Sequence, residues 1–433
     1  MKADPSRTHV WLASLCVLAL VGCAEVSVLP PNDDGGAGQG GASEPPPPVD
    51  CEVTDSCPVT CEAGFENCDA RSSNGCEAEL DVDAHHCGAC DNDCGTWGDC
   101  FAGQCVEVLA TTVGGFVGAN ALVPIGDDLY FSSGGLDLHG GLVARVPLVG
   151  GPVETLSFGI TFPERLVNSG DTLAFDSIVD PGVFTVSVAG GPVTTPWLPG
   201  SGESARVLAM KEGSVYFTTG TDVRRLTLVS GAVAVVAQGL VDVESAVVAD
   251  NALWITDLGP EIAVDDQGHT TMGHPYGTIA HVDLTSGTVT TLATNLDTPH
   301  AVLPVGNNIV WVEGGNRASY DDGGDYGTFG RVMRAGLDGS SPTLLMDDLT
   351  QPVDLAVDDS GAWVFVAEAG TVLGVQDGSD AFLSQGRVLA LPIAGGEPRT
   401  LVPNIDARRV AFAKGRVVFS SWVYNLIMSV AAP

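Results

Sequence analysis

The hydrophobic pattern beyond residue 105 is repetitive. Short apolar phrases that follow turn residues recur seven times, and their third residues are Phe131, Phe175, Phe217, Ile255, Trp311, Phe365 and Phe419. Each phrase is preceded by one more apolar segment and followed by an alternating segment, a glycine turn and a segment rich in Thr, Val and Leu. Alternation with a period of two predicts strands with one buried face. Four such strands per unit of about 40–55 residues are typical of a β-propeller blade.

The two ends of this array predict how the ring closes. The seventh unit contains three strands and finishes at 426–430, shortly before the last residue. A spare strand-like segment, 107–113, precedes the first unit and is expected to become the outer strand of the last blade, which would remove exposed strand edges. The sequence therefore predicts an all-β fold with a seven-bladed propeller over residues 107–433. Uneven spacing keeps six or eight blades open, and an open β-sandwich with coincidental repeats is the alternative.

The repeated phrases also resemble known propeller families. Residues 143–148 lead to the turn Gly150-Gly151, and residues 388–393 lead to the turn Gly395-Gly396 in the same way. These units resemble TolB-like, NHL-like and streptogramin-lyase-like propellers, and their phrases are similar to the propellers of myxobacterial lipoproteins. The resemblance implies the fold. It implies no single function, because propellers host many activities.

The composition agrees with a folded core and narrows the range of partners. Of the 433 residues, 45% are hydrophobic, which provides enough apolar surface for folding. The 54 Asp and Glu residues outnumber the 18 Lys and Arg residues and give a formal net charge of −36. Nucleic-acid binding requires Lys and Arg to displace phosphate counterions. We therefore expect no nucleic acid among the partners.

The N-terminus, residues 1–22, has the pattern of an export signal. Two basic residues precede a 13-residue apolar run over 10–22, which is too short to span a bilayer and is typical of a secretory signal. The sequence Leu20-Val21-Gly22-Cys23 resembles the bacterial lipobox. That resemblance implies cleavage before Cys23, its lipidation and membrane anchoring, and an ordinary secretory peptide is the alternative. In lipoproteins of enteric bacteria, an aspartate directly after the lipidated cysteine is the signal for retention in the inner membrane, and this chain has Ala24 at that place. We therefore expect the protein to be anchored in the cell envelope, with the outer membrane or cell surface favoured over the inner membrane.

A tether and a cysteine-rich block follow. Residues 23–50 are rich in Gly and Pro and predict a disordered, flexible linker. In the module 51–106, an even number of cysteines in an exported chain implies up to five disulfides, which would replace hydrophobic burial. Spacing leaves their connectivity open. The cysteines are Cys51, Cys57, Cys61, Cys68, Cys76, Cys87, Cys90, Cys94, Cys100 and Cys105.

Other chemistry is conceivable in this block. His85 and His86 beside the cysteines could supply zinc ligands, which is the alternative to disulfides. Acidic pairs such as Asp91 and Asp93 could bind calcium, but the distal residues of an EF-hand loop are missing from the sequence. The phrases 67–69, 74–77 and 87–90 resemble a cysteine-rich module of exported proteins from myxobacteria. That resemblance implies compartment and lineage and no defined activity.

Units four to six are longer than the others, and the extra length falls between their second and third strands. The three inserts are 257–277, 313–330 and 367–386. Such connections emerge on one face of a propeller, so the inserts should build a shared surface. The candidate ligand-binding residues are Asp257, His269, His274, Tyr276, His300, Glu313, Asn316, Tyr320, Tyr326 and Glu368. Asp321, Asp322 and Asp325 are candidate Ca²⁺ ligands, and a solvated acidic loop is the alternative.

The predicted function is binding. We expect an exported, lipid-anchored binding or scaffold protein whose inserts recognise a protein, peptide or glycan, with no required cofactor and Ca²⁺ as an optional ligand. The alternative is a metal-dependent propeller enzyme of the lyase or lactonase/hydrolase type, since the histidines could act as acids or bases. No spacing maps onto the active sites of those families. Nucleophile-elbow, Walker and zinc-protease motifs are missing from the sequence.

Overall fold

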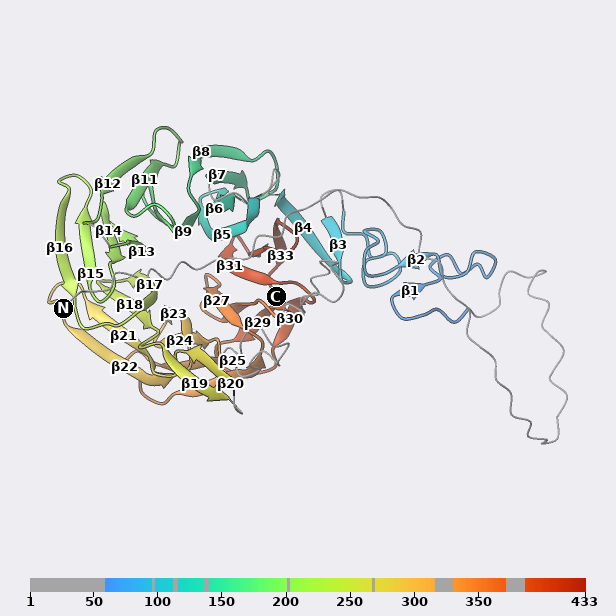
Figure 1. Cartoon of the computed structure of the whole chain (residues 1–433). Coiled ribbons are helices and arrows are strands. Elements are labelled where there is room, and N and C mark those ends of the chain that lie inside the picture. The colour runs from blue at the N-terminus through green and yellow to red at the C-terminus, as the bar shows by residue number, and fades with distance from the viewer. Residues whose placement is uncertain are drawn as a thin grey trace. The chain divides into compact units, whose positions relative to one another are not determined.

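The computed structural model describes residues 59–95, 98–111, 116–135, 140–200, 203–266, 269–315, 330–370 and 386–433. All regular secondary structure in these residues is β (Figure 1). The chain divides into two compact units, 1–50 and 51–433, and the first unit lies outside the described residues. Within the described part, no helix is long and apolar enough to cross a membrane.

Six blades are sequential four-stranded antiparallel sheets, each numbered from the inner to the outer strand. Blade 1 contains β5 (Phe116–Ile125), β6 (Asp128–Gly135), β7 (Gly141–Pro147) and β8 (Glu154–Ile160). Blade 2 contains β9 (Pro163–Ser169), β10 (Thr172–Ser177), β11 (Val183–Ser187) and β12 (Thr194–Trp197). Blade 3 contains β13 (Arg206–Lys211), β14 (Ser214–Thr218), β15 (Val223–Thr227) and β16 (Ala232–Ala237).

Blades 4 to 6 repeat this order and carry the inserts. Blade 4 contains β17 (Val243–Ala249), β18 (Ala252–Asp257), β21 (Gly277–Asp283) and β22 (Val289–Leu296), with the hairpin β19 (Ile262–Asp266) and β20 (His269–Gly273) in its insert. Blade 5 contains β23 (Pro299–Val305), β24 (Asn308–Glu313), β25 (Gly330–Gly336) and β26 (Thr343–Leu349). Blade 6 contains β27 (Pro352–Val357), β28 (Trp363–Glu368), β29 (Arg387–Pro392) and β30 (Arg399–Val402).

The seventh blade joins the two ends of the propeller. It contains β31 (Ala407–Ala413), β32 (Arg416–Ser421) and β33 (Leu426–Ala431), and its fourth strand is β4 (Gln104–Thr111). Leu426 lies opposite Thr111, and Ile427 lies opposite Ala110. The predicted closing strand and the seven-bladed all-β fold are therefore confirmed, with the strand beginning three residues earlier, at Gln104 instead of residue 107.

The repeated phrases build the core between the blades. The third residue of every phrase is buried, and five of the seven are phenylalanines. Phe365 and Phe419, from blades 6 and 7, pack in one apolar cluster with Val388. Burying such a side chain stabilises the fold by about 1.5–3 kcal/mol. The repetition in the sequence is thus the repetition of the packing between blades.

A glycine and a proline lock several blades to their neighbours. Gly330, the first residue of β25, packs against Pro352, the first residue of β27 in the next blade. A Cβ at Gly330 would lie 2.3 Å from Cδ of that proline, and a Cβ at Gly277 would lie 2.3 Å from Cδ of Pro299. These approaches are too close for any side chain on the glycine. The glycines therefore mark where the insert-bearing strands return to the sheet.

The cysteine-rich module is held by disulfides. The pairs are Cys61–Cys76, Cys68–Cys90, Cys87–Cys100 and Cys94–Cys105. Disulfide bonding is therefore confirmed for these cysteines, which consequently offer no thiolate to zinc. Cys51 and Cys57 lie outside the described residues. The short ladder of β1 (Phe65–Glu66) with β2 (Ala78–Glu79) and the hairpin of β3 (Gly98–Phe101) with β4 complete the module.

Candidate functional site

The three inserts leave the propeller from one face. The strands β18, β24 and β28 occupy the same place in consecutive blades, and they end at Asp257, Glu313 and Glu368. Each of these residues lies opposite the first residue of the inner strand of its own blade. The inserts therefore emerge at the end of the ring where the inner strands begin. We call this end the insert face.

Asp257, a predicted ligand-binding residue, holds the turn that enters its own blade. Its side chain is buried. One carboxylate oxygen accepts hydrogen bonds from Asp242 N at 2.8 Å and Gly259 N at 3.0 Å, and the other accepts one from Val241 N at 2.9 Å. Because these backbone donors need a partner when they are removed from water, the carboxylate stabilises the turn between blades 3 and 4.

Glu313 and Glu368 have the same place in blades 5 and 6. Glu313 accepts hydrogen bonds from Asp297 N at 3.0 Å and from Trp311 Nε1 at 3.1 Å, and Glu368 accepts one from Thr350 N at 2.6 Å. Both are also paired with an arginine at the start of the returning strand. These pairs are Glu313 with Arg331 at 2.8 Å and Glu368 with Arg387 at 2.5 Å. A buried carboxylate before each insert and an arginine after it clamp the two ends of the insert together.

The predicted histidines occupy different environments. His274 Nδ1 lies 3.3 Å from the carbonyl oxygen of Gly259, and Thr298 N donates to the carbonyl of His274 at 3.0 Å. His300 lies on β23 and lines the central channel described below. A Cβ at Gly314, at the base of the second insert, would lie 2.6 Å from Nε2 of His300. His300 therefore connects the channel to the insert face.

The remaining predicted site residues are less defined. The Tyr276 side chain is exposed. The backbone of His269 belongs to β20, opposite Asp266, but its side chain is not described. Outside the described residues lie Asn316, Tyr320, Asp321, Asp322, Asp325 and Tyr326. Ligand binding by these residues and Ca²⁺ binding by the three aspartates stay predictions.

The inner strands of all seven blades surround a central channel (Figure 1). The cavity has a volume of about 220 Å³. Its charged and polar lining includes Asn120, Arg165, Glu244, His300, Asp354 and Arg409. Apart from Asn120, each of these lies among the first three residues of its strand. The polar part of the channel, which we call the channel ring, therefore lies toward the insert face.

Two arginines hold the carboxylate of Glu244 in the ring. Arg165 Nη2 lies 3.5 Å from Glu244 Oε1, and Arg206 Nη1 lies 3.1 Å from Oε2. Arg165 also donates to the Glu244 carbonyl oxygen. Burial alone would raise the pKa of Glu244, but the attraction of these guanidinium groups outweighs burial and lowers the pKa to about 2. Glu244 is therefore ionised at neutral pH and paired on both oxygens.

Two further acids connect inner strands of adjacent blades. Asp176 accepts hydrogen bonds from Arg165 N and Val207 N, both at 2.9 Å, and burial raises its pKa to about 6. Asp354 accepts hydrogen bonds from Leu355 N and Val410 N, both at 3.0 Å. Burial raises the pKa of Asp354 more than its arginine neighbours lower it. These carboxylates fix the spacing of the strands that bear the ring.

Two polar atoms in the ring have no hydrogen-bond partner within the described part of the chain. They are Oδ1 of Asn120 and Nε of Arg165. Asn120 is 2% exposed, and its other amide atom, Nδ2, donates to the Pro163 carbonyl at 2.9 Å. Buried polar atoms are normally paired. Two residues of the ring therefore each keep one buried polar atom without a partner among the described residues.

The sequence interpretation found His300 but missed the arginines and acids of the ring. Six of the seven inner strands each contribute one of the ring residues named above, and the contributing positions extend from Asn120 to Arg409. A signal was present in the repeat itself. In five of the seven inner strands a charged or polar residue stands second or third, as in Glu244 of β17 and Asp354 of β27. Aligning the inner strands by their first residue would have revealed it.

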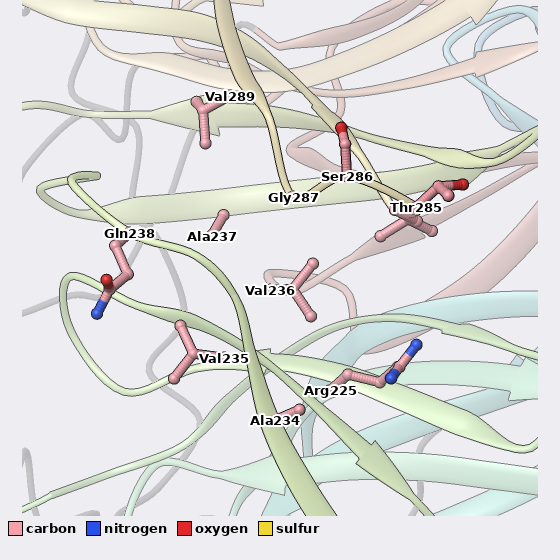
Figure 2. Close-up of a pocket in the computed structure, with 11 residues that line it drawn as sticks. Arg225, Ala234, Val235, Val236, Ala237, Gln238, Thr285, Ser286, Gly287 and Val289 are labelled. Atoms are coloured by element: carbon pink, nitrogen blue, oxygen red, sulfur yellow. The ribbon is translucent and has the colours of Figure 1, made fainter.

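A second, larger cavity lies between blades 3 and 4. This outer groove has a volume of about 640 Å³ and lies between β16 and the turn that contains Thr285, Ser286 and Gly287 (Figure 2). Its lining is mainly small or aliphatic, and Arg225 is the charged side chain among the described residues that form it. The outer groove therefore presents little chemistry that could select a ligand.

Comparison with known proteins identifies the fold. No protein-family model and no curated protein matches the sequence. Among solved structures, the chain is similar to selenomethionine-substituted virginiamycin B lyase from Staphylococcus aureus, with a TM-score of 0.54 and 12% identity over 76% of this chain and 99% of that chain. It is also similar to hydrazine synthase from Kuenenia stuttgartiensis, with a TM-score of 0.53 and 12% identity over 75% of this chain and 99% of that chain. At these identities the likeness concerns the fold alone, and at that level the resemblance to streptogramin-lyase-like propellers is confirmed.

Proposed function

We propose that this chain is an exported, lipid-anchored binding protein of the cell envelope whose insert face recognises a protein, peptide or glycan. The observation that carries the proposal is the common origin of the three inserts. Each follows the second strand of its blade, and the channel ring lies at the same end of the molecule. Long loops on a rigid scaffold are a usual place for recognition. The face is therefore suited to a partner that spans several loops.

The disulfides support export. Disulfides persist in oxidising compartments outside the cytoplasm, and the described residues of the module before the propeller form four. Cys23, in the lipobox-like sequence, is the proposed lipidation site, and residues 23–50 are the proposed tether. Such an anchor would hold the propeller at the outer membrane or cell surface.

The described geometry favours binding over the metal-dependent enzyme. A catalytic centre at the channel mouth would need several predicted acids and histidines directed into one cavity. Instead, Asp257, Glu313 and Glu368 bond to turns of their own blades, while His300 alone of the predicted site residues lines the channel within the described part of the chain. The three carboxylates are thereby engaged in maintaining the insert face.

Affinity capture from envelope fractions tests the proposal. The bait is the full chain, compared with a variant that lacks 316–329 but keeps both ends of the second insert. An Arg225→Gln variant in the outer groove is the control. We expect wild type and the control to retain the same partner and the shortened variant to lose it. Retention by the shortened variant, or no specific partner for wild type, would overturn the role of the insert face.

Fractionation tests the anchor separately. We expect wild-type protein in the membrane fraction and a Cys23→Ser variant in the soluble extracytoplasmic fraction, because the acyl chains supply the membrane affinity. Equal membrane association of both proteins would overturn the lipid anchor without affecting the binding proposal.

A further inference from the structure

The outer edge of blade 3 is an exposed, apolar strand. β16 is the last strand of its sheet, so its outer side has no partner strand among the described residues. Residues 232–235 pair one to one with β15, and the register shifts beyond Val235. All four side chains are exposed, and those of Val233 and Val235 are 41% and 51% exposed. Because an edge strand presents a row of unpaired backbone N–H and C=O groups, β16 offers these groups beside exposed valines.

The neighbouring blade approaches only one end of this edge. The turn of blade 4 that contains Gly287 comes close to the carbonyl oxygen of Val236, which would lie 2.9 Å from a Cβ on that glycine. The outer groove of about 640 Å³ lies between this turn and β16, and Ala234 and Val235 belong to its lining (Figure 2). Residues 232–235 are therefore open to another strand.

The other outer strands carry features that hinder such pairing. Natural sheets protect their edges with charged residues, with proline or by covering the strand. β4 is covered by β3, and β12 contains Pro196. β8, β26 and β30 contain charged residues, and β22, which has no charge, contains three threonines and an asparagine. β16, with the sequence Ala-Val-Ala-Val-Val-Ala, has none of these features.

The charge and the sequence of the edge favour a second copy of the chain as the pairing strand. The formal net charge is −36, so two copies repel one another wherever their acidic surfaces approach. Residues 226–241 contain no charged residue, so two copies that meet at β16 bring no like charges into opposition there. Val233-Ala234-Val235 also reads the same in both directions. An antiparallel copy centred on Ala234 therefore places Val233 opposite Val235 of the other copy.

We propose that two copies of this chain pair through β16 into a two-fold symmetric dimer. The two strands lie antiparallel and join both blades 3 into one continuous sheet. Because β16 is the one outer strand of the seven that lacks protection, the pairing ends at two copies. Blade 3 carries no insert, so the dimer presents two insert faces. This inference goes beyond the proposed recognition function and does not depend on it.

Sedimentation velocity of the full chain tests the dimer. Every protein carries Cys23→Ser, so that acyl chains cannot hold the copies together. We expect this parent protein to show a reversible equilibrium between monomer and dimer. Val233→Lys combined with Val235→Lys should weaken the dimer at least about tenfold, because lysines on an edge bring like charges into opposition.

The matched control changes two exposed valines of blade 1. Val149→Lys combined with Val153→Lys adds the same charge at a distant place and should sediment like the parent protein. A parent protein that is monomeric at every concentration, or that forms larger assemblies, overturns the proposal. Equal association of the parent protein and the β16 variant overturns it as well.

Hydrogen exchange decides the question even if the β16 variant fails to fold. When the parent protein is compared at low and high concentration, the amides of 232–235 should exchange at least about tenfold more slowly in the dimer. The amides of β8, the outer strand of blade 1, should exchange equally at both concentrations. Association without protection of 232–235 overturns the role of β16. A monomeric parent protein that protects 232–235 only when another protein is added would show that the pairing strand is not a second copy.

Discussion

Replacing Glu313 by alanine tests whether the base of the second insert is a structural clamp. Glu313 is 1% exposed and accepts hydrogen bonds from Asp297 N and Trp311 Nε1. A buried donor that loses its acceptor costs about 1–3 kcal/mol. Arg331 is 42% exposed, so its ion pair with Glu313 adds at most about 1 kcal/mol. We expect Glu313→Ala to lower the free energy of unfolding by about 3–5 kcal/mol.

Urea unfolding of the full chain with its disulfides intact, followed by tryptophan fluorescence, measures this change. The matched variant is Arg331→Gln, for which we expect a loss below about 1 kcal/mol because the buried donors keep their acceptor. A loss below about 1 kcal/mol for Glu313→Ala, or equal losses for both variants, would refute the clamp. If Glu313→Ala kept its stability but failed to capture the partner, Glu313 would be a ligand-binding residue, as the sequence predicts.

Three further predictions concern blade packing, a buried acid and the disulfides. Gly330→Ala should lower the free energy of unfolding by about 1–3 kcal/mol, because the new Cβ would lie 2.3 Å from Cδ of Pro352 in the next blade. Gly200 has open space around it, so the control Gly200→Ala should leave the urea midpoint unchanged. Burial raises the pKa of Asp176 from 3.8 to about 6. Between these two pH values the folded state keeps a proton that the unfolded chain releases. As the pH rises from 3.8 to about 6, this group should therefore lower the free energy of unfolding. Between pH 4 and 7, wild type should therefore lose up to roughly 3 kcal/mol relative to Asp176→Asn in urea unfolding, and parallel pH profiles would contradict this. Reduction of the disulfides should increase hydrogen exchange across 61–103, because Ala78, Cys87 and Cys100 are the buried apolar residues among those described there. The strand 426–431 should stay protected, because it packs in the propeller core.

The fold was predictable because a propeller repeats one local unit. Each buried phenylalanine, such as Phe131 or Phe419, belongs to a phrase that recurs with the same neighbours, so the pattern identifies the second strand of every blade. The closing strand was predictable for a related reason. A seventh unit with three strands and an unassigned apolar segment before the first unit leave one consistent pairing, which β4 makes with β33. Both inferences depend on periodicity and need no knowledge of side-chain contacts.

The insert carboxylates show where this reasoning weakens. Asp257, Glu313 and Glu368 stand at the boundary between a strand and a long loop, and acids in such loops are normally solvated. The register instead places each opposite the first residue of an inner strand, where backbone N–H groups of the incoming turn need an acceptor. That requirement comes from the pairing of strands in three dimensions. A sequence shows the acid but not the donors it satisfies.

The channel ring could not be seen as a motif because no two of its principal members come from the same blade. Arg165, Glu244, Asp354 and Arg409 belong to blades 2, 4, 6 and 7, so they lie far apart in the sequence. A charged residue in a strand is ordinarily assigned to the solvent-exposed face of the sheet. In a propeller, that side of an inner strand faces the central channel instead of bulk solvent, because the other six blades lie across the channel from it. Closure of the propeller therefore brings polar positions from six inner strands into one cavity, and it is there that the charges must either satisfy one another or accept a ligand.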